Sequence, residues 1–121
     1  MKTFNRIKSY QKINKDTRKS IDKGIKKLRD RLNTYFSNNE NINDIHGDGI
    51  LIHDIYDEDG YKFYVYKCRV LTMSLRLLYT IEDGNLVIVS YYIKETPYNK
   101  INDYFKFFEL ECKIYCMNKK R

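Results

Sequence analysis

The stretch that decides the fold is residues 61–94, which reads YKFYVYKCRVLTMSLRLLYTIEDGNLVIVSYYIK. Three runs rich in β-branched and aromatic residues are separated by two breaks, the second of which contains Asp83-Gly84-Asn85. Runs of this kind, bounded by turn residues, predict an antiparallel meander. Because a cation is costly to bury, we expect one dry face and one basic face that is open to water. The cations within these runs are Lys67, Arg69, Arg76 and Lys94.

A further strand is expected just before this stretch, from Ile50 to Tyr56, and the turn at 57–60 joins it to the next. The four predicted strands therefore cover about residues 50–56, 61–69, 75–82 and 86–94. A three-residue connection at 83–85 pairs Glu82 with Leu86 and aligns the apolar faces of the last two strands. This register places Arg76 opposite Tyr92 and Ser74 opposite Lys94.

The N-terminal part is predicted to be helical over about residues 9–36. From Asp16 onward one apolar stripe recurs at helical spacing, and Asp16 and Thr17 are the candidate N-caps. A shorter helix at Ser9–Ile13 is expected to complete a helical hairpin, while residues 1–7 fit either an extra edge strand or the start of a helix. The stripe consists of Ile21, Ile25, Leu28, Leu32, Tyr35 and Phe36.

The C-terminal segment, residues 98–121, supports two interpretations. Asn102–Phe108 is compatible with the opening of a helix, whereas alternate apolar residues from Phe108 to Cys116 are compatible with a strand. Together the elements predict a single α+β domain over residues 1–121, with a helical hairpin packed on a four-stranded antiparallel meander.

The charge of the chain is unevenly distributed. The net charge of +7 divides into +9 over residues 1–36, −7 over residues 37–60 and +5 over residues 61–121. A basic body with one acidic segment favours a polyanionic partner, and the alternative is that the lysines only solvate the surface. The sequence has no apolar run long enough to cross a bilayer and no signal-peptide pattern. We therefore expect a cytoplasmic protein that does not associate with membranes.

Three cysteines, an odd number without framework spacing, fit a reducing compartment. Cys112 and Cys116 are too few ligands for a zinc site, so no metal and no cofactor is expected.

The sequence Arg76-Leu77-Leu78-Tyr79-Thr80-Ile81-Glu82-Asp83-Gly84 looks like a motif of Arg, two apolar residues, Tyr, any residue and an apolar residue, followed by an acidic turn. Lys94-Glu95-Thr96-Pro97-Tyr98 is similar to an Arg-x3-Tyr motif, with Lys94 in place of Arg and Ile93 where a His is frequent. With these two motifs the chain resembles the RelE/ParE superfamily of small bacterial toxins, over about residues 50–98.

The resemblance implies a toxin of a type II toxin-antitoxin system that cleaves mRNA on the ribosome, without a metal, by attack of the ribose 2′-OH on its own phosphate. Partners implied are a cognate antitoxin protein and mRNA on the ribosome. One alternative is a non-enzymatic protein of the same fold that inhibits gyrase or another target protein. The other is a basic RNA- or protein-binding module. The resemblance implies catalytic roles for Arg76, Lys94 and Tyr98, and RNA contacts for Lys67, Arg69 and Tyr92.

Overall fold

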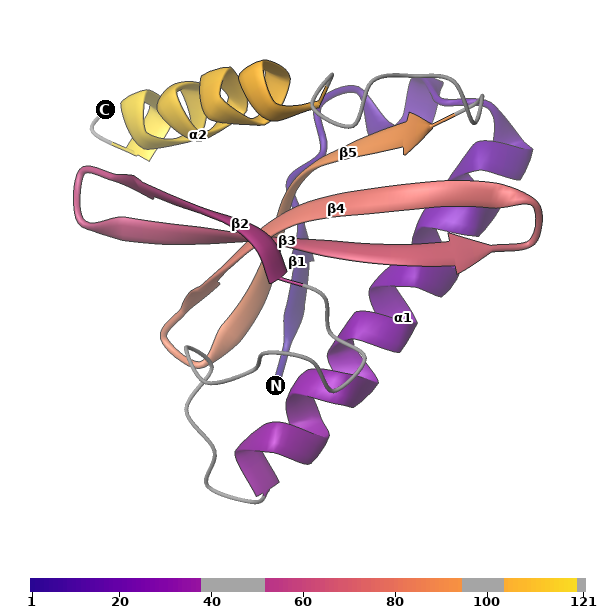
Figure 1. The fold of residues 1–121 in the computed structure, drawn as a ribbon, viewed down its shortest axis with the longest axis horizontal. Helices are drawn as coiled ribbons and strands as arrows, with labels where there is room; N and C mark the ends of the chain where they lie inside the picture. The colour runs from indigo at the N-terminus through magenta and orange to yellow at the C-terminus, as the bar shows by residue number, and fades with distance from the viewer. Residues whose placement is uncertain (38–51, 95–103, 120–121) are drawn as a thin grey trace.

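The computed structural model describes residues 1–37, 52–94 and 104–119, and for residues 52–57 and Lys94 it describes the backbone. In chain order its elements are β1 (Thr3–Asn5), the 3₁₀ turn η1 (Tyr10–Lys12), α1 (Lys15–Ser37), β2 (Ile52–Glu58), β3 (Tyr61–Val70), β4 (Met73–Glu82), β5 (Asn85–Lys94) and α2 (Phe105–Lys119). Strands β2 to β5 follow one another without an intervening helix, between α1 and α2, which confirms the predicted α+β class (Figure 1).

One five-stranded sheet forms the middle of the molecule, in the order β1-β5-β4-β3-β2. Strands β2 to β5 cover the four stretches expected as strands, and each pairs antiparallel with its neighbour in sequence. The N-terminal strand β1 pairs in parallel with β5, with Thr3 opposite Leu86 and Asn5 opposite Ile88. The sheet is therefore mixed and has five strands, and its parallel member β1 is the N-terminal edge strand that was one of the two possibilities for residues 1–7.

The β4–β5 connection corrects the predicted register near the turn. Glu82 pairs with Asn85 across the two-residue turn Asp83-Gly84, and both turn residues have positive φ, 51° and 76°, as two-residue hairpins of this kind require. The predicted pairing of Glu82 with Leu86 is therefore wrong.

A bulge at Val89 then shifts the register by one residue, because Leu78 pairs with Ser90 while Tyr79 pairs with Ile88. Beyond the bulge Arg76 lies opposite Tyr92. The same shift places Ser74 opposite Lys94, so both pairings predicted for this end of the hairpin are present.

The N-terminal helical hairpin is absent from the described residues: α1 is one long helix, and the stretch from Ser9 to Ile13 forms only the single turn η1. Asn14 explains both this and the wrong choice of N-cap, because its side-chain oxygen accepts a hydrogen bond from the backbone N–H of Asp16 at 2.8 Å. With α1 capped at Asn14, too few residues remain for a second stable helix.

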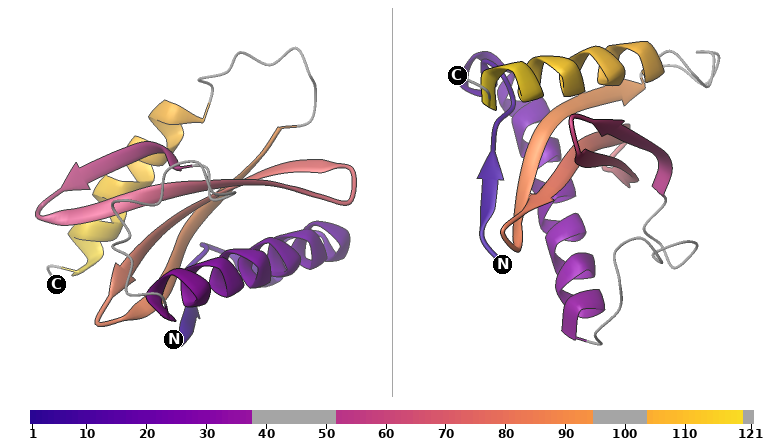
Figure 2. Two further views of the ribbon diagram at one scale, coloured as in Figure 1. Left: turned by 60° about the horizontal axis from the view of Figure 1, so that its bottom comes forward. Right: turned by 90° about the vertical axis from the view of Figure 1, so that its left-hand side faces the viewer.

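Helices α1 and α2 lie on opposite faces of the sheet (Figures 1 and 2). The predicted stripe of α1 packs on one face, apart from Phe36, which is 37% exposed. The C-terminal segment forms the helix α2, so the strand alternative is wrong. On the other face α2 buries an aromatic and apolar cluster that includes Phe63, Val65, Leu78 and Phe108. This second face is thus largely dry, contrary to the expectation of one water-exposed face.

Candidate functional site

Three of the predicted cations converge at one end of the face that α2 covers. Lys67 lies directly opposite Arg76 on the neighbouring strand, and Arg69 lies opposite Ser74. The β3–β4 hairpin that carries them extends beyond the N-terminal end of α2 (Figures 1 and 2). We call Lys67, Arg69 and Arg76 the basic surface.

Arg76 is the buried member of the basic surface. Only 4% of it is exposed, and its guanidinium carbon lies 4.2 Å from the centre of the Tyr104 ring, a cation–π contact. Within the described residues its Nε atom is buried and has no hydrogen-bond partner. The predicted water-exposed position of Arg76 is therefore wrong, because α2 brings Tyr104 over it.

Lys67 and Arg69 are the accessible members, since Lys67 is half-buried and Arg69 is exposed. No carboxylate among residues 1–37, 58–93 and 104–119 forms an ion pair with any member of the basic surface. Like charges directly opposite each other destabilise a sheet, so the pairing of Lys67 with Arg76 costs stability in the absence of an anion.

The N-terminal end of α2 adds to the positive potential at this place. The carbonyl of Tyr104 accepts the first hydrogen bond of the helix, from the N–H of Phe108 at 2.8 Å. The helix dipole therefore has its positive end beside Arg76. The cations, which have no ion-pair partner among the described residues, and this dipole both favour an anion at the same end of the sheet.

Tyr104 is the residue of this region that the sequence interpretation missed. Its ring centre lies 6.1 Å from that of Tyr92 and 5.5 Å from that of Phe108, so the three form one aromatic series. Tyr92, predicted to contact RNA, is half-buried within this series. The four-residue spacing of Tyr104, Phe108, Cys112 and Cys116 was the available signal, because it defines one face of a helix.

Two predicted site residues are less fully placed. The backbone of Lys94 pairs with Ser74, two residues before Arg76 in β4, so the Cα of Lys94 belongs to the same end of the sheet. Tyr98 lies outside the described residues, and its role stays a prediction.

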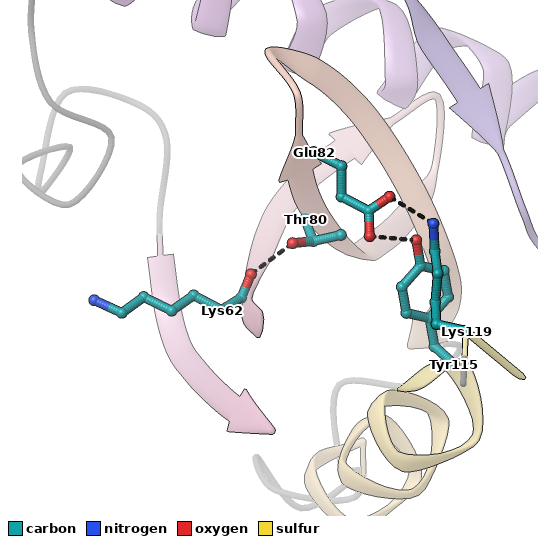
Figure 3. Close-up of polar contacts among 5 residues, drawn as sticks. All are labelled: Lys62, Thr80, Glu82, Tyr115 and Lys119. Atoms are coloured by element: carbon teal, nitrogen blue, oxygen red, sulfur yellow. Dashed lines mark hydrogen bonds and ion pairs between the residues drawn. The ribbon is translucent and has the colours of Figure 1, made fainter. Parts of the chain in front are cut away.

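The opposite end of the same face holds a polar cluster that fixes α2 on the sheet (Figure 3). The carboxylate of Glu82 accepts a hydrogen bond from the Tyr115 hydroxyl at 2.9 Å and pairs with the Lys119 ammonium at 3.0 Å. Burial, followed by the hydrogen bond to Glu82, raises the pKa of Tyr115 above its usual range. Nearby, the Thr80 hydroxyl donates to the Lys62 carbonyl at 2.7 Å. The contacts of Glu82 thus attach the C-terminal part of α2 to β4, at the end of the sheet away from the basic surface.

No group of three or more His, Cys, Asp or Glu residues in the described part of the chain has the arrangement of a metal site. Cys112 and Cys116 instead pack among apolar residues on the sheet-facing side of α2, and burial raises the pKa of the Cys112 thiol to about 12. Neither described helix is long and apolar enough to span a membrane.

Comparisons with protein-family models, with curated proteins and with solved structures give no match for this chain.

Proposed function

We propose that this chain is the toxin of a type II toxin-antitoxin system, which acts in the cytoplasm as a ribosome-dependent endoribonuclease and is neutralised by a cognate antitoxin. The proposal rests on the resemblance to the RelE/ParE superfamily and on one observation above all. Lys67 and Arg76 lie directly opposite each other without an ion-pair partner among the described residues, an arrangement that an RNA phosphate would stabilise.

The reaction proposed needs no metal. The ribose 2′-oxygen attacks the adjacent phosphorus, the bond from phosphorus to the 5′-oxygen breaks, and a 2′,3′-cyclic phosphate forms. One proton leaves the 2′-OH and one is delivered to the departing 5′-oxygen. Negative charge accumulates on the phosphate oxygens in the transition state, and fixed cations stabilise that charge.

The burial of the three cations suggests a division of their roles. Arg69 and Lys67 are accessible and would contact RNA phosphates directly, whereas Arg76 lies beneath Tyr104 and contributes its charge from below. Lys94 is the proposed second transition-state cation, and Tyr98 the proposed proton donor or acceptor. Tyr92 is proposed to contact an RNA base.

The direct test is primer extension on mRNA incubated with ribosomes and the purified protein. We expect cleavage by the wild type and a loss of about tenfold or more in Lys67→Ala and Arg69→Ala, since each removes an interaction with the developing charge. Lys23→Ala is the matched control, because Lys23 is an exposed lysine of α1. Circular dichroism melting must show that all variants stay folded.

Three outcomes would contradict the proposal. Intact mRNA together with trapped DNA breaks would indicate a gyrase inhibitor. Intact mRNA and intact DNA would indicate a non-enzymatic RNA- or protein-binding module. Cleavage that Lys67→Ala, Arg69→Ala and Lys23→Ala leave equally unaffected would remove the basic surface from the mechanism.

A further inference from the structure

The outer face of α2 carries a second apolar stripe that nothing in the described structure covers. Its four members are between 41% and 63% exposed: Phe107, Leu110, Ile114 and Met117. The inner face of the same helix is a separate stripe, made of Tyr104, Phe108, Cys112 and Cys116, which are at most 4% exposed. A contiguous row of large exposed apolar side chains is typical of an interaction surface. The outer stripe is therefore not needed to hold α2 on its own sheet.

The spacing of the outer stripe is that of a two-stranded coiled coil. Its members follow one another at intervals of three, four and three residues, which is the a and d pattern of a heptad repeat. Phe107 and Ile114 take the a positions, and Leu110 and Met117 take the d positions. A β-branched residue at a with Leu at d favours a pair of parallel helices.

The charges beside the stripe are complementary to those of a second copy only when the two helices are parallel. Lys106 lies on one flank and Glu111 on the other, at heptad positions g and e. In a parallel pair each Lys106 faces Glu111 of the other copy, which is an attractive g–e contact. In an antiparallel pair each flank of one helix faces the same flank of the other helix, so Glu111 faces Glu111 and Lys113 faces Lys113 of the other copy.

The surroundings of these charges are compatible with the parallel pair. The Glu111 carboxylate accepts a hydrogen bond from the Ser90 hydroxyl at 3.4 Å, which holds it on the flank beside β5 and leaves it other acceptor positions. Lys113 is 3.7 Å from Glu109 within the helix. Because the inner stripe already holds α2 folded on the sheet, pairing of two copies does not carry the cost of helix nucleation.

We propose that this protein forms a homodimer in which the outer stripes of two α2 helices pack in parallel. The dimer goes beyond the proposed RNA cleavage and does not depend on it. It places the two sheets on opposite sides of the helix pair, because the inner and outer stripes lie on opposite sides of α2.

The first experiment is sedimentation equilibrium of the purified protein between about 1 µM and about 1 mM, a range that covers weak self-association. We expect a monomer–dimer equilibrium that Ile114→Glu weakens by about tenfold or more, as loss of a central apolar contact does. Leu71→Gln is the matched control, since Leu71 is 64% exposed but lies in the β3–β4 hairpin. It should dimerise like the wild type.

The second experiment tests the orientation. Lys106→Glu and Glu111→Lys should each weaken the dimer, and the double variant should restore it. In the parallel pair, Met117→Cys should form a disulfide between residue 117 of one protomer and residue 117 of the other. In the antiparallel pair it should not, because residue 117 there lies next to Phe107 of the other protomer. The wild type, which has three cysteines that are buried or half-buried, is the control for crosslinking.

A wild type that stays monomeric over the whole concentration range would overturn the proposal and assign the outer stripe to a different protein. A dimer that Ile114→Glu does not weaken would place the interface elsewhere. A dimer that Ile114→Glu weakens but in which Met117→Cys forms no intermolecular disulfide would overturn the parallel orientation. None of these results depends on whether the protein cleaves RNA, so the two proposals fail separately.

Discussion

Gly24 is the position where a single added methyl group tests how α1 packs on the sheet. It is buried in the interior of α1, and a Cβ atom there would lie 2.5 Å from Cδ2 of Leu75 and 3.4 Å from Sγ of Cys68. Two carbon atoms pack best at about 3.5–4.0 Å, so the Leu75 methyl would have to move by roughly 1 Å. Leu75 is itself fully buried, so it has little room to move.

Two opposing effects determine the result of Gly24→Ala. Alanine favours the helix by about 1 kcal/mol relative to glycine, whereas overpacking of a filled core costs about 1–3 kcal/mol. We expect the overpacking to exceed the gain, so that the free energy of unfolding falls by about 1 kcal/mol.

The measurement is urea denaturation followed by circular dichroism, in the wild type and in the background Leu75→Val. That substitution shortens the side chain that the added methyl meets, so Gly24→Ala should there stabilise the protein by about 1 kcal/mol. Ser20→Ala, on the same face one turn earlier, is the control. Its hydroxyl is fully buried and has no hydrogen-bond partner among the described residues, so alanine should stabilise by about 1 kcal/mol.

The reasoning would be refuted by a stabilising Gly24→Ala in the wild-type background. An equal effect in both backgrounds would also refute it, because the contact with Leu75 would then contribute nothing.

Three further predictions concern the turn, the cysteines and the polar cluster. Leu71 has φ of 57° and is exposed, so Leu71→Asn should raise the free energy of unfolding by about 0.5 kcal/mol in urea denaturation, because asparagine tolerates this conformation better. Burial raises the pKa of Cys68 from 9.0 to about 11 and that of Cys112 to about 12. The folded protein thus keeps both protons where the unfolded chain loses them, and stability measured by denaturation at several pH values should be constant below pH 9.0 and fall between about 9 and 12, less steeply in Cys68→Ala. Glu82→Gln removes the charge that pairs with Lys119 at 3.0 Å and should lower the melting stability by about 0.5 kcal/mol at low salt, with a smaller difference in 1 M NaCl.

The sequence predicted α1 and the positions of β2 to β5 because these elements have one dominant apolar face or clear turn residues at their ends. Which residues of β5 face α1 and which face α2 was not predictable in the same way. Residues 86–89 are all apolar and all buried, with Leu86 and Ile88 facing α1 and Val89 facing α2. A run that is apolar on both faces fits either phase, so the bulge at Val89 left no signal in the pattern.

The position of Arg76 could not be predicted for a related reason. Whether its face is open depends on α2, and the sequence of α2 is apolar on two sides. The inner stripe, which includes Phe108, and the outer stripe, which includes Leu110, interleave along the sequence. Apolar residues then fall at every second position, which is the pattern of a strand and not of a helix. Only the packed structure shows that Tyr104 covers Arg76.

The parallel pairing of β1 with β5 has a consequence for folding during synthesis. Thr3 is synthesised before its partner Leu86, which follows 83 positions later in the chain. During synthesis β1 therefore cannot pair until β5 has left the ribosome. Strands β2, β3 and β4 can pair earlier, because their contacts are local in sequence. Pairing of β1 with β5 is thus expected to follow the pairing of β2, β3 and β4 in the nascent chain.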